Sequence, residues 1–365
     1  MTKKVLHVFG IMNRGGAELR TLSTLERMRK LGVEYEFLVL SGQKGVLDQE
    51  ITERGSKVHY CPLSLTFFFQ FMSILKAGKY DVVHSHVSLV SGVILFISWL
   101  GGIKRRVAHF RSTHDVENPS ALRRIRDKFL RRLLLTFSHY IAGVCEATLD
   151  AFWHFDWRED SRFRVIYNGF EQHNVVYQER FWHDYLGVSA DNKIIINVSR
   201  MHEQKNHPRL IEIFCEYCQK NNDAVLVLIG KEDPEIKQQL QRIGALNNAD
   251  ERIFYLGEKA QVLPFMKHAN MMLFPSKWEG LPGAVLEAAS LGVPVLASDI
   301  PGVLEIAQQL DVVHYFPLVQ SNQSWALQIT QLLSQPLEHE VGRQTFKNSV
   351  FQLDHNVKQL YALYA

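Results

Sequence analysis

The sequence predicts an α/β protein made of two doubly wound, Rossmann-like domains in tandem. Its 365 residues exceed the size, about 250–300 residues, at which a single hydrophobic core stops growing. Short apolar segments typical of buried strands alternate with segments of helical periodicity, which indicates parallel strands joined by helical crossovers. The alternation runs through residues 1–172, pauses at a polar, aromatic-rich connector, and begins again in residues 186–345. We therefore expect one domain in each range.

The expected elements follow from the spacing of apolar residues and from glycine and proline at their ends. In the first domain we expect strands at 5–9, 34–40, 57–60, 82–84, 106–110, 140–143 and 165–168, and helices near 17–30, 48–54, 66–76 and 89–102. In the second we expect strands at 194–199, 224–230, 253–256, 271–274 and 294–298, and helices near 208–221, 235–244, 260–267 and 281–291. Residues 343–364 contain neither proline nor glycine and read as one long helical tract.

Composition and charge restrict the class of protein. Hydrophobic residues make up 46% of the chain and charged residues 22%, as in globular proteins. Residues 1–180 carry 26 basic and 18 acidic side chains, so we expect the first domain to meet an anionic partner, and we expect no nucleic-acid partner. Four cysteines are too few for a disulfide framework, and the amino terminus lacks the apolar run of a signal peptide. The expected location is the cytoplasm.

The stretch 274–287 combines a strand end, a turn and a helix start around two carboxylates. Pro282 fits the first helical position, so backbone N–H groups near Gly283 and Ala284 lack helical partners and form an anion site. Glu279 precedes the helix and Glu287 lies inside it. Carboxylates that flank an anion site suit a ligand with both phosphates and hydroxyls, such as a nucleotide-sugar. The alternative is that Glu279 and Glu287 are solvent-exposed acidic residues near a helix start and bind no ligand.

The pattern Ser276-x-x-Glu279-Gly280-x-Pro282-x-x-x-x-Glu287-Ala288 resembles the E-x7-E signature of retaining glycosyltransferases of family 4, the group 1 enzymes. With two further motifs the similarity covers nearly the whole chain, and Met12-Asn13-Arg14 and Lys205-Asn206-His207 are most like the branch that builds bacterial exopolysaccharides. The resemblance implies a GT-B fold, in which two Rossmann-like domains face an interdomain cleft. It also implies that a helix over about 346–365 packs back on the first domain.

The loop after the first strand contains the pair Gly15-Gly16 and opens a helix. Its spacing fits neither a P-loop nor a dinucleotide fingerprint, but paired glycines let backbone N–H groups approach a phosphate. By resemblance this is the family's glycine loop, which contacts the distal phosphate of the donor and shapes the acceptor side. The alternative is a tight strand-to-helix turn.

Two cations follow the first strand of the second domain. Arg200 and Lys205 resemble the family's R-x4-K element, which holds the donor diphosphate; the alternative is a surface pair of cations. Because the departing diphosphate gains negative charge, fixed cations stabilise the transition state. Gly230 closes a strand as the family's nucleotide wall does, and a UDP-sugar is expected ahead of a GDP-sugar. The role of Glu305, which follows a substituted glycine pair, stays open.

Histidines end two strands of the first domain. His114 matches the family's histidine that reaches the donor sugar, typically its 6-hydroxyl. His84 and His86 point to the same side of their strand and are expected to line the cleft, although such residues are also often structural. A metal site would need further ligands, and no D-x-D carboxylate pair occurs, so we expect no metal and no cofactor beyond the donor substrate.

Residues 120–135 form a basic amphipathic helix on a wheel of 3.6 residues per turn. Leu122, Ile125, Phe129 and Leu133 share one side, and Arg124, Lys128 and Arg131 lie opposite. The basic segment from Arg123 to Arg132 suits peripheral contact with an anionic leaflet of the plasma membrane. The alternative is a helix packed on the sheet with a solvated basic face. Both interpretations are compatible if the apolar side faces the core while the arginines face the lipid headgroups.

Together these features predict retaining transfer of a sugar from a nucleoside-diphosphate donor to a saccharide acceptor, which we expect to be polyprenyl-linked. By resemblance, Glu279 binds hydroxyls of the donor sugar, Glu287 binds the ribose, and attack comes from the face that the diphosphate leaves. One alternative is a nucleotide-sugar 2-epimerase of the same fold, which needs no acceptor. Another is a catalytically silent scaffold in a polysaccharide assembly complex.

Overall fold

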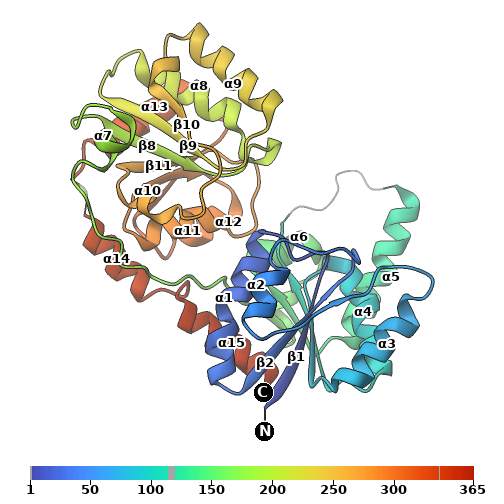
Figure 1. Cartoon of the computed structure of the whole chain (residues 1–365). Coiled ribbons are helices and arrows are strands. Elements are labelled where there is room, and N and C mark those ends of the chain that lie inside the picture. Colours follow the sequence, from blue (N-terminus) through green and yellow to red (C-terminus); the bar gives the residue numbers. More distant parts are fainter. Residues whose placement is uncertain (1, 114–119, 337) are drawn as a thin grey trace. The chain divides into compact units, whose positions relative to one another are not determined.

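The computed structural model describes residues 2–113, 120–336 and 338–365, and it divides the chain into two compact α/β units (Figure 1). The first unit comprises Met1–Gly169 and Leu353–Ala365, and the second comprises Phe170–Gln352. Each unit is organised around its own parallel sheet. The prediction of two Rossmann-like α/β domains is confirmed.

The first unit contains a seven-stranded sheet in the order β3-β2-β1-β4-β5-β6-β7, in which each strand pairs with its neighbours in parallel. Its strands are β1 (Lys3–Phe9), β2 (Val33–Val39), β3 (Val58–Tyr60), β4 (Val82–Ser85), β5 (Arg105–Phe110), β6 (Tyr140–Gly143) and β7 (Phe163–Val165). The order of connection reverses between β1 and β4. Ligands of such sheets bind beyond the carboxyl ends of the strands at this switch point.

Helices cover both faces of the first sheet, as alternation along β1 requires. Leu6 and Val8 pack with α3 (Phe67–Gly78), α4 (Ser91–Leu100), α5 (Ala121–Phe137) and α6 (Glu146–Phe152). Val5 and Phe9 point to the other face, where they pack with α1 (Gly16–Lys30), α2 (Asp48–Glu53) and α15 (Leu353–Tyr364). The carboxyl-terminal helix therefore completes the core of the first unit.

The second unit repeats the same plan with a six-stranded sheet in the order β10-β9-β8-β11-β12-β13. Its strands are β8 (Lys193–Val198), β9 (Ala224–Ile229), β10 (Ile253–Tyr255), β11 (Met271–Phe274), β12 (Val295–Ser298) and β13 (Val313–Phe316). Its helices are α7 (Phe181–Leu186), α8 (His207–Cys218), α9 (Pro234–Leu246), α10 (Leu263–Lys267), α11 (Gly283–Ser290), α12 (Pro301–Ala307), α13 (Asn322–Leu333) and α14 (His339–Lys347). The switch point lies between β8 and β11.

The single helical tract expected over residues 343–364 is wrong. The chain forms two helices, α14 and α15, separated by residues 348–352. The carbonyl of Phe351 accepts a hydrogen bond of 2.8 Å from the N–H of Phe170, and Gln352 forms an isolated parallel bridge with the same residue. Because Phe351 is fully buried, this pairing with a segment far away in the sequence outweighs local helical propensity.

Helix α5 buries a different side from the one that the helical wheel identifies as apolar. Leu130 and Leu134 are buried against α4, where Gly92 lets the two backbones approach: a Cβ there would lie 2.7 Å from the carbonyl oxygen of Leu130. Leu122, Ile125 and Phe129 are instead exposed, so the interpretation in which this side faces the core is wrong for the first half of the helix. Among the described residues, no helix is both long enough and apolar enough to cross a bilayer.

Candidate functional site

Residues predicted to hold the donor follow the central strands of the second sheet. Arg200 lies two residues beyond β8, and Gly230 comes directly after β9. Lys205 ends a short 3-10 helix (Glu203–Lys205), and Glu279 lies in the turn after β11. β8 and β11 are neighbours at the switch point, so the fold brings two sequence-distant loops together at the edge where a ligand of this sheet is expected.

The two loops meet in a buried ion pair. The Nζ atom of Lys205 lies 2.5 Å from the Oε1 atom of Glu279, and their side chains are only 17% and 9% exposed. The ammonium also lies 5.1 Å from the centre of the Phe274 ring. A cation and a carboxylate are thus presented together, and a ligand with negative and hydroxyl groups could bind both.

Backbone contacts hold these loops in register. The N–H of Lys277 donates to the carbonyl of Gln204 at 2.8 Å, and the side-chain amide of Gln204 donates to the carbonyl of Trp278 at 2.8 Å. Asn206 adopts the left-handed conformation, with φ 55°, and donates to the carbonyl of Pro275 at 3.1 Å. Asparagine tolerates this conformation better than most residues.

The start of α11 differs by one residue from the prediction. Pro282 is the residue before the helix rather than its first residue, because its ψ of 109° is extended. The helix begins at Gly283, so the N–H groups of Gly283 and Ala284 belong to its first turn and have no helical acceptor. Glu287 lies one turn further along. Glu279 therefore lies only four residues before the amino terminus of α11, which carries the positive end of the helix dipole.

Two positions at this edge of the sheet require glycine because the backbone of another loop lies too close for a side chain. Gly230 has φ 148°, and a Cβ there would collide with the carbonyl of Ser199, the residue before Arg200. A Cβ on Gly302, in the first turn of α12, would collide with the carbonyl of Gly280. Both glycines thus fix the loops that carry the predicted site residues. Glu305 lies in α12, one turn beyond Gly302.

We expect Gly230→Ala to weaken donor binding at least ten-fold. The added methyl group must displace Ser199 and with it Arg200, and a φ of 148°, which is essentially restricted to glycine, costs about 1–3 kcal/mol in addition. The Michaelis constant for the donor and the melting temperature measure the two effects. Gly187→Ala is the matched control, because Gly187 has φ 71° but nothing within 4 Å of its Cβ position. Equal Michaelis constants for the two variants would contradict the role of Gly230.

The glycine loop of the first unit opens α1. Gly15 is the residue before the helix and has an ordinary extended backbone, with φ −97° and ψ 163°, whereas Gly16 is exposed at its first position. A Cβ on Gly15 would meet only the carboxylate of Glu18, the end of a flexible side chain that can move away, so the structure does not require glycine at this position. Burial raises the pKa of Glu18, against the smaller effects of its own N–H and the nearby Arg111.

Four histidines form a cluster across the central strands of the first sheet. The Nδ1 atom of His7 lies 3.0 Å from the Nε2 atom of His86, and the Nε2 atom of His84 lies 3.2 Å from the Nδ1 atom of His109. His84 is fully buried and bonds the hydroxyl of Tyr364 at 2.6 Å. The expectation that His84 lines a cleft is therefore wrong, because α15 covers it.

The cluster includes three imidazoles whose nitrogens could hold a metal. One nitrogen from each of His7, His84 and His86 lies within 4.8 Å of the other two. However, the Nε atom of Arg111 donates to the Nδ1 atom of His86 at 3.3 Å, and its guanidinium also donates to Asn168 at 2.6 Å. Burial lowers the pKa of Arg111 to about 10, so the group stays cationic at neutral pH. Its charge opposes a divalent cation, and the absence of a metal stays a prediction.

Sequence reasoning missed part of this arrangement. His7, His109, Arg111 and Glu18 were not among the predicted site residues, yet they surround the carboxyl edge of the first sheet. A usable signal was present, since β1, β4 and β5 each carry a histidine near the carboxyl end. His114, which was predicted, lies outside the described residues.

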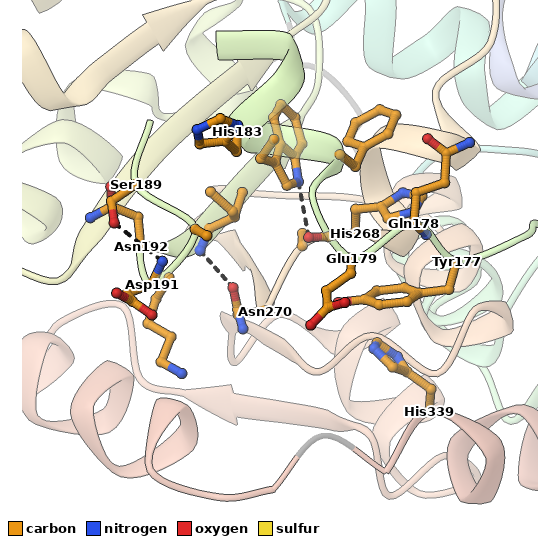
Figure 2. A pocket seen from close by; sticks show the side chains of 16 residues that line it. Tyr177, Gln178, Glu179, His183, Ser189, Asp191, Asn192, His268, Asn270 and His339 are labelled. Atoms are coloured by element: carbon orange, nitrogen blue, oxygen red, sulfur yellow. Dashed lines mark hydrogen bonds between the residues drawn. The ribbon is translucent and has the colours of Figure 1, made fainter. Parts of the chain in front are cut away.

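A separate hollow of about 240 Å³ lies at the opposite edge of the second sheet (Figure 2). Lys193, the first residue of β8, and Asn270, just before β11, line it, so it opens at the amino ends of the strands. Figure 2 shows Tyr177 and Glu179 side by side near His268, whose ring stacks on Tyr177 at 5.1 Å. Among the described residues, none of those predicted to hold the donor lines this hollow.

Comparison with known proteins agrees with the geometry. The family described as Glycosyl transferases group 1 matches residues 178–348, and the family described as Glycosyltransferase Family 4 matches residues 14–173. The capsular polysaccharide biosynthesis glycosyltransferase CapH of Staphylococcus aureus is 30% identical over 370 residues, covering 99% of this chain and 98% of CapH.

Two further relatives extend the comparison. The Escherichia coli UDP-Gal:alpha-D-GlcNAc-diphosphoundecaprenol alpha-1,3-galactosyltransferase is 27% identical over 244 residues, covering 63% of this chain and 60% of that enzyme. Anabaena HepE, solved in complex with UDP, superimposes with a TM-score of 0.82 at 17% identity and covers 99% of both chains. The fold is therefore of the GT-B type. The chain belongs to the group 1 glycosyltransferases of family 4.

Proposed function

We propose that the protein transfers a sugar from a nucleoside-diphosphate donor, with UDP expected ahead of GDP, to a saccharide acceptor in bacterial exopolysaccharide or other surface-glycan biosynthesis. The observation that carries the proposal is the buried pair of Lys205 and Glu279 beside the start of α11 at the switch point of the second sheet. A cation, a carboxylate and helical N–H groups at one edge of the sheet support the proposal. The relationship to CapH supports the biological setting.

The proposed chemistry assigns each group a task. Arg200, Lys205 and the N–H groups of Gly283 and Ala284 hold the diphosphate and stabilise the charge that develops as the glycosidic bond breaks. Glu279 accepts hydrogen bonds from the donor sugar. Glu287 does so from the ribose.

The proposed reaction keeps the anomeric configuration without a covalent intermediate. The acceptor hydroxyl attacks from the face that the diphosphate leaves, and the departing phosphate oxygen takes its proton. The bond between the anomeric carbon and the donor oxygen breaks as the bond to the acceptor oxygen forms. We propose a polyprenyl-linked saccharide as acceptor, supported by the name of the E. coli relative, which specifies a diphosphoundecaprenol-linked substrate.

A panel of UDP-, GDP- and ADP-sugars tests the donor proposal. We expect one sugar to be released slowly by hydrolysis and to be transferred when a polyprenyl-diphosphate saccharide is added, with NMR showing the donor's anomeric configuration in the product. An inverted product would contradict the retaining mechanism. Conversion of the donor to an isomeric nucleotide-sugar without any acceptor would instead identify a 2-epimerase.

We expect transfer to need no divalent cation. Arg200 and Lys205 supply the positive charge that a metal would otherwise provide at the diphosphate. Initial rates measured in 5 mM EDTA, a concentration chosen for roughly complete chelation, should stay within about two-fold of those with added magnesium. Loss of turnover in EDTA, restored by magnesium, would show that these two side chains do not suffice.

A further inference from the structure

The first half of α5 presents an apolar stripe to solvent. Leu122, Ile125 and Phe129 recur at intervals of three and four residues, so their side chains lie on one side of the helix. They are 78%, 69% and 59% exposed. Single exposed apolar residues are common, but three large ones on successive turns form a continuous patch of the kind that marks an interaction surface.

Basic side chains border this stripe. α5 contains six basic residues and one acidic residue, Asp127, which is buried and lies 2.7 Å from the guanidinium of Arg126. On the helical wheel Arg126 flanks the stripe on one side and Arg132, followed by Lys128, on the other, and all three are exposed. An apolar stripe between arginine and lysine side chains is typical of a helix that lies in the interface of an anionic bilayer.

A second apolar segment lies at the same edge of the sheet. Leu63, Leu65, Phe68 and Phe69, in the loop after β3 and the first turn of α3, are exposed. α3 and α5 both start from the carboxyl edge of the parallel sheet, and α4 packs against each of them (Figure 1). The exposed apolar side chains therefore concentrate at the edge of the first unit that also holds the glycine loop.

We propose that these elements form a docking surface for an anionic lipid bilayer. The docking surface is defined by Leu63, Leu65, Phe68, Phe69, Leu122, Ile125 and Phe129, with Arg126, Lys128 and Arg132. A second copy of the chain fits less well, because pairing this face with itself would bring two strongly basic helices together. The inference goes beyond the proposed reaction, since a chain that transferred no sugar would still bind.

The docking surface would bring the carboxyl edge of the first sheet close to the headgroups. A polyprenyl-linked acceptor keeps its lipid in the leaflet, so an enzyme that rests on the leaflet meets its saccharide without extracting it. The basic residues attract the anionic bilayer, and the apolar stripe holds the helix in its interface. Binding should therefore fall when salt is raised or when the anionic lipid is omitted.

Co-sedimentation with vesicles tests the proposal. We expect the full chain to bind vesicles containing phosphatidylglycerol and to bind pure phosphatidylcholine vesicles at least ten-fold more weakly. The triple variant Leu122→Ser, Ile125→Ser, Phe129→Ser should lower binding to the anionic vesicles at least ten-fold. The matched control is Leu246→Ser, Val319→Ser, Val341→Ser, which removes three similarly exposed apolar side chains from the second unit and should bind as the wild type does.

The proposal would be overturned if the docking surface bound something other than an anionic bilayer, or nothing. Equal binding of the wild type and the α5 variant to anionic vesicles would exclude the stripe as the docking element. A wild-type dimer in light scattering that the α5 variant loses, with vesicle binding unchanged, would show that the stripe pairs two copies. Donor hydrolysis without vesicles should be the same in the wild type and the α5 variant, so failure of the docking proposal is distinguishable from failure of the proposed reaction.

Discussion

Replacing Lys205 by alanine should lower kcat/KM for sugar transfer about 1,000-fold, a loss of about 4 kcal/mol of transition-state stabilisation. The variant removes a cation from the proposed leaving-group site and leaves the Glu279 carboxylate without the ammonium 2.5 Å away. A carboxylate that is 9% exposed and has lost this ammonium also repels the donor diphosphate. Steady-state kinetics with the donor identified in the panel measure the effect.

Lys277→Ala is the matched control for this prediction. Lys277 lies on the same pair of loops, where its Nζ atom is 3.1 Å from a carboxylate oxygen of Glu203, but both side chains are well exposed. An exposed pair contributes little, so kcat/KM should change less than about two-fold. If both lysine variants lost activity equally, the loops would matter only for stability. If neither did, Lys205 would have no part in the reaction.

Lowering the pH from 6.5 to 5 should destabilise the first unit by several kcal/mol. Burial lowers the pKa of His7 to about 3 and holds the pKa values of His84, His86 and His109 well below their usual value, with further lowering by neighbouring charges, Arg111 among them. Below pH 6.5 the unfolded chain therefore binds protons that the folded chain does not. Each such histidine lowers the free energy of unfolding by up to about 1.4 kcal/mol per pH unit until the pH reaches its folded pKa.

Urea denaturation at several pH values measures this slope. The variant His109→Asn removes one histidine from the cluster. It should reduce the slope of unfolding free energy against pH by up to about 1.4 kcal/mol per pH unit, the contribution of one proton. His183→Asn is the control, because His183 is an exposed residue of the second unit and lies outside the cluster. A slope that is flat in the wild type, or equal in the wild type and His109→Asn, would contradict the assignment of neutral, buried imidazoles.

Local sequence patterns predicted most of the strands because their buried residues form short apolar segments, but β13 was not predicted. They also predicted that Arg200, Lys205 and Glu279 follow β8 and β11, and the three residues lie in the loops after these strands; their part in binding a donor stays a prediction. Contacts between segments that lie far apart in the sequence were harder to predict. The histidine cluster depends on register across β1, β4 and β5, in which His7 pairs with His84, and no local pattern gives that register.

Packing partners limited the remaining predictions. A helical wheel identifies the apolar side of α5, but it does not say whether another element covers that side. The break between α14 and α15 likewise depends on Phe170, which pairs with the segment from more than 170 residues away in the chain. Both errors arise because burial is decided by tertiary contacts rather than by propensity.

The most direct test of the central claim is an experimental structure of the protein with bound UDP. We predict the diphosphate beside Arg200 and Lys205, within hydrogen-bonding distance of the N–H groups of Gly283 and Ala284, and the ribose against Glu287. Density for UDP in the hollow at the amino ends of β8 and β11, or at any place away from the Lys205–Glu279 pair, would contradict it.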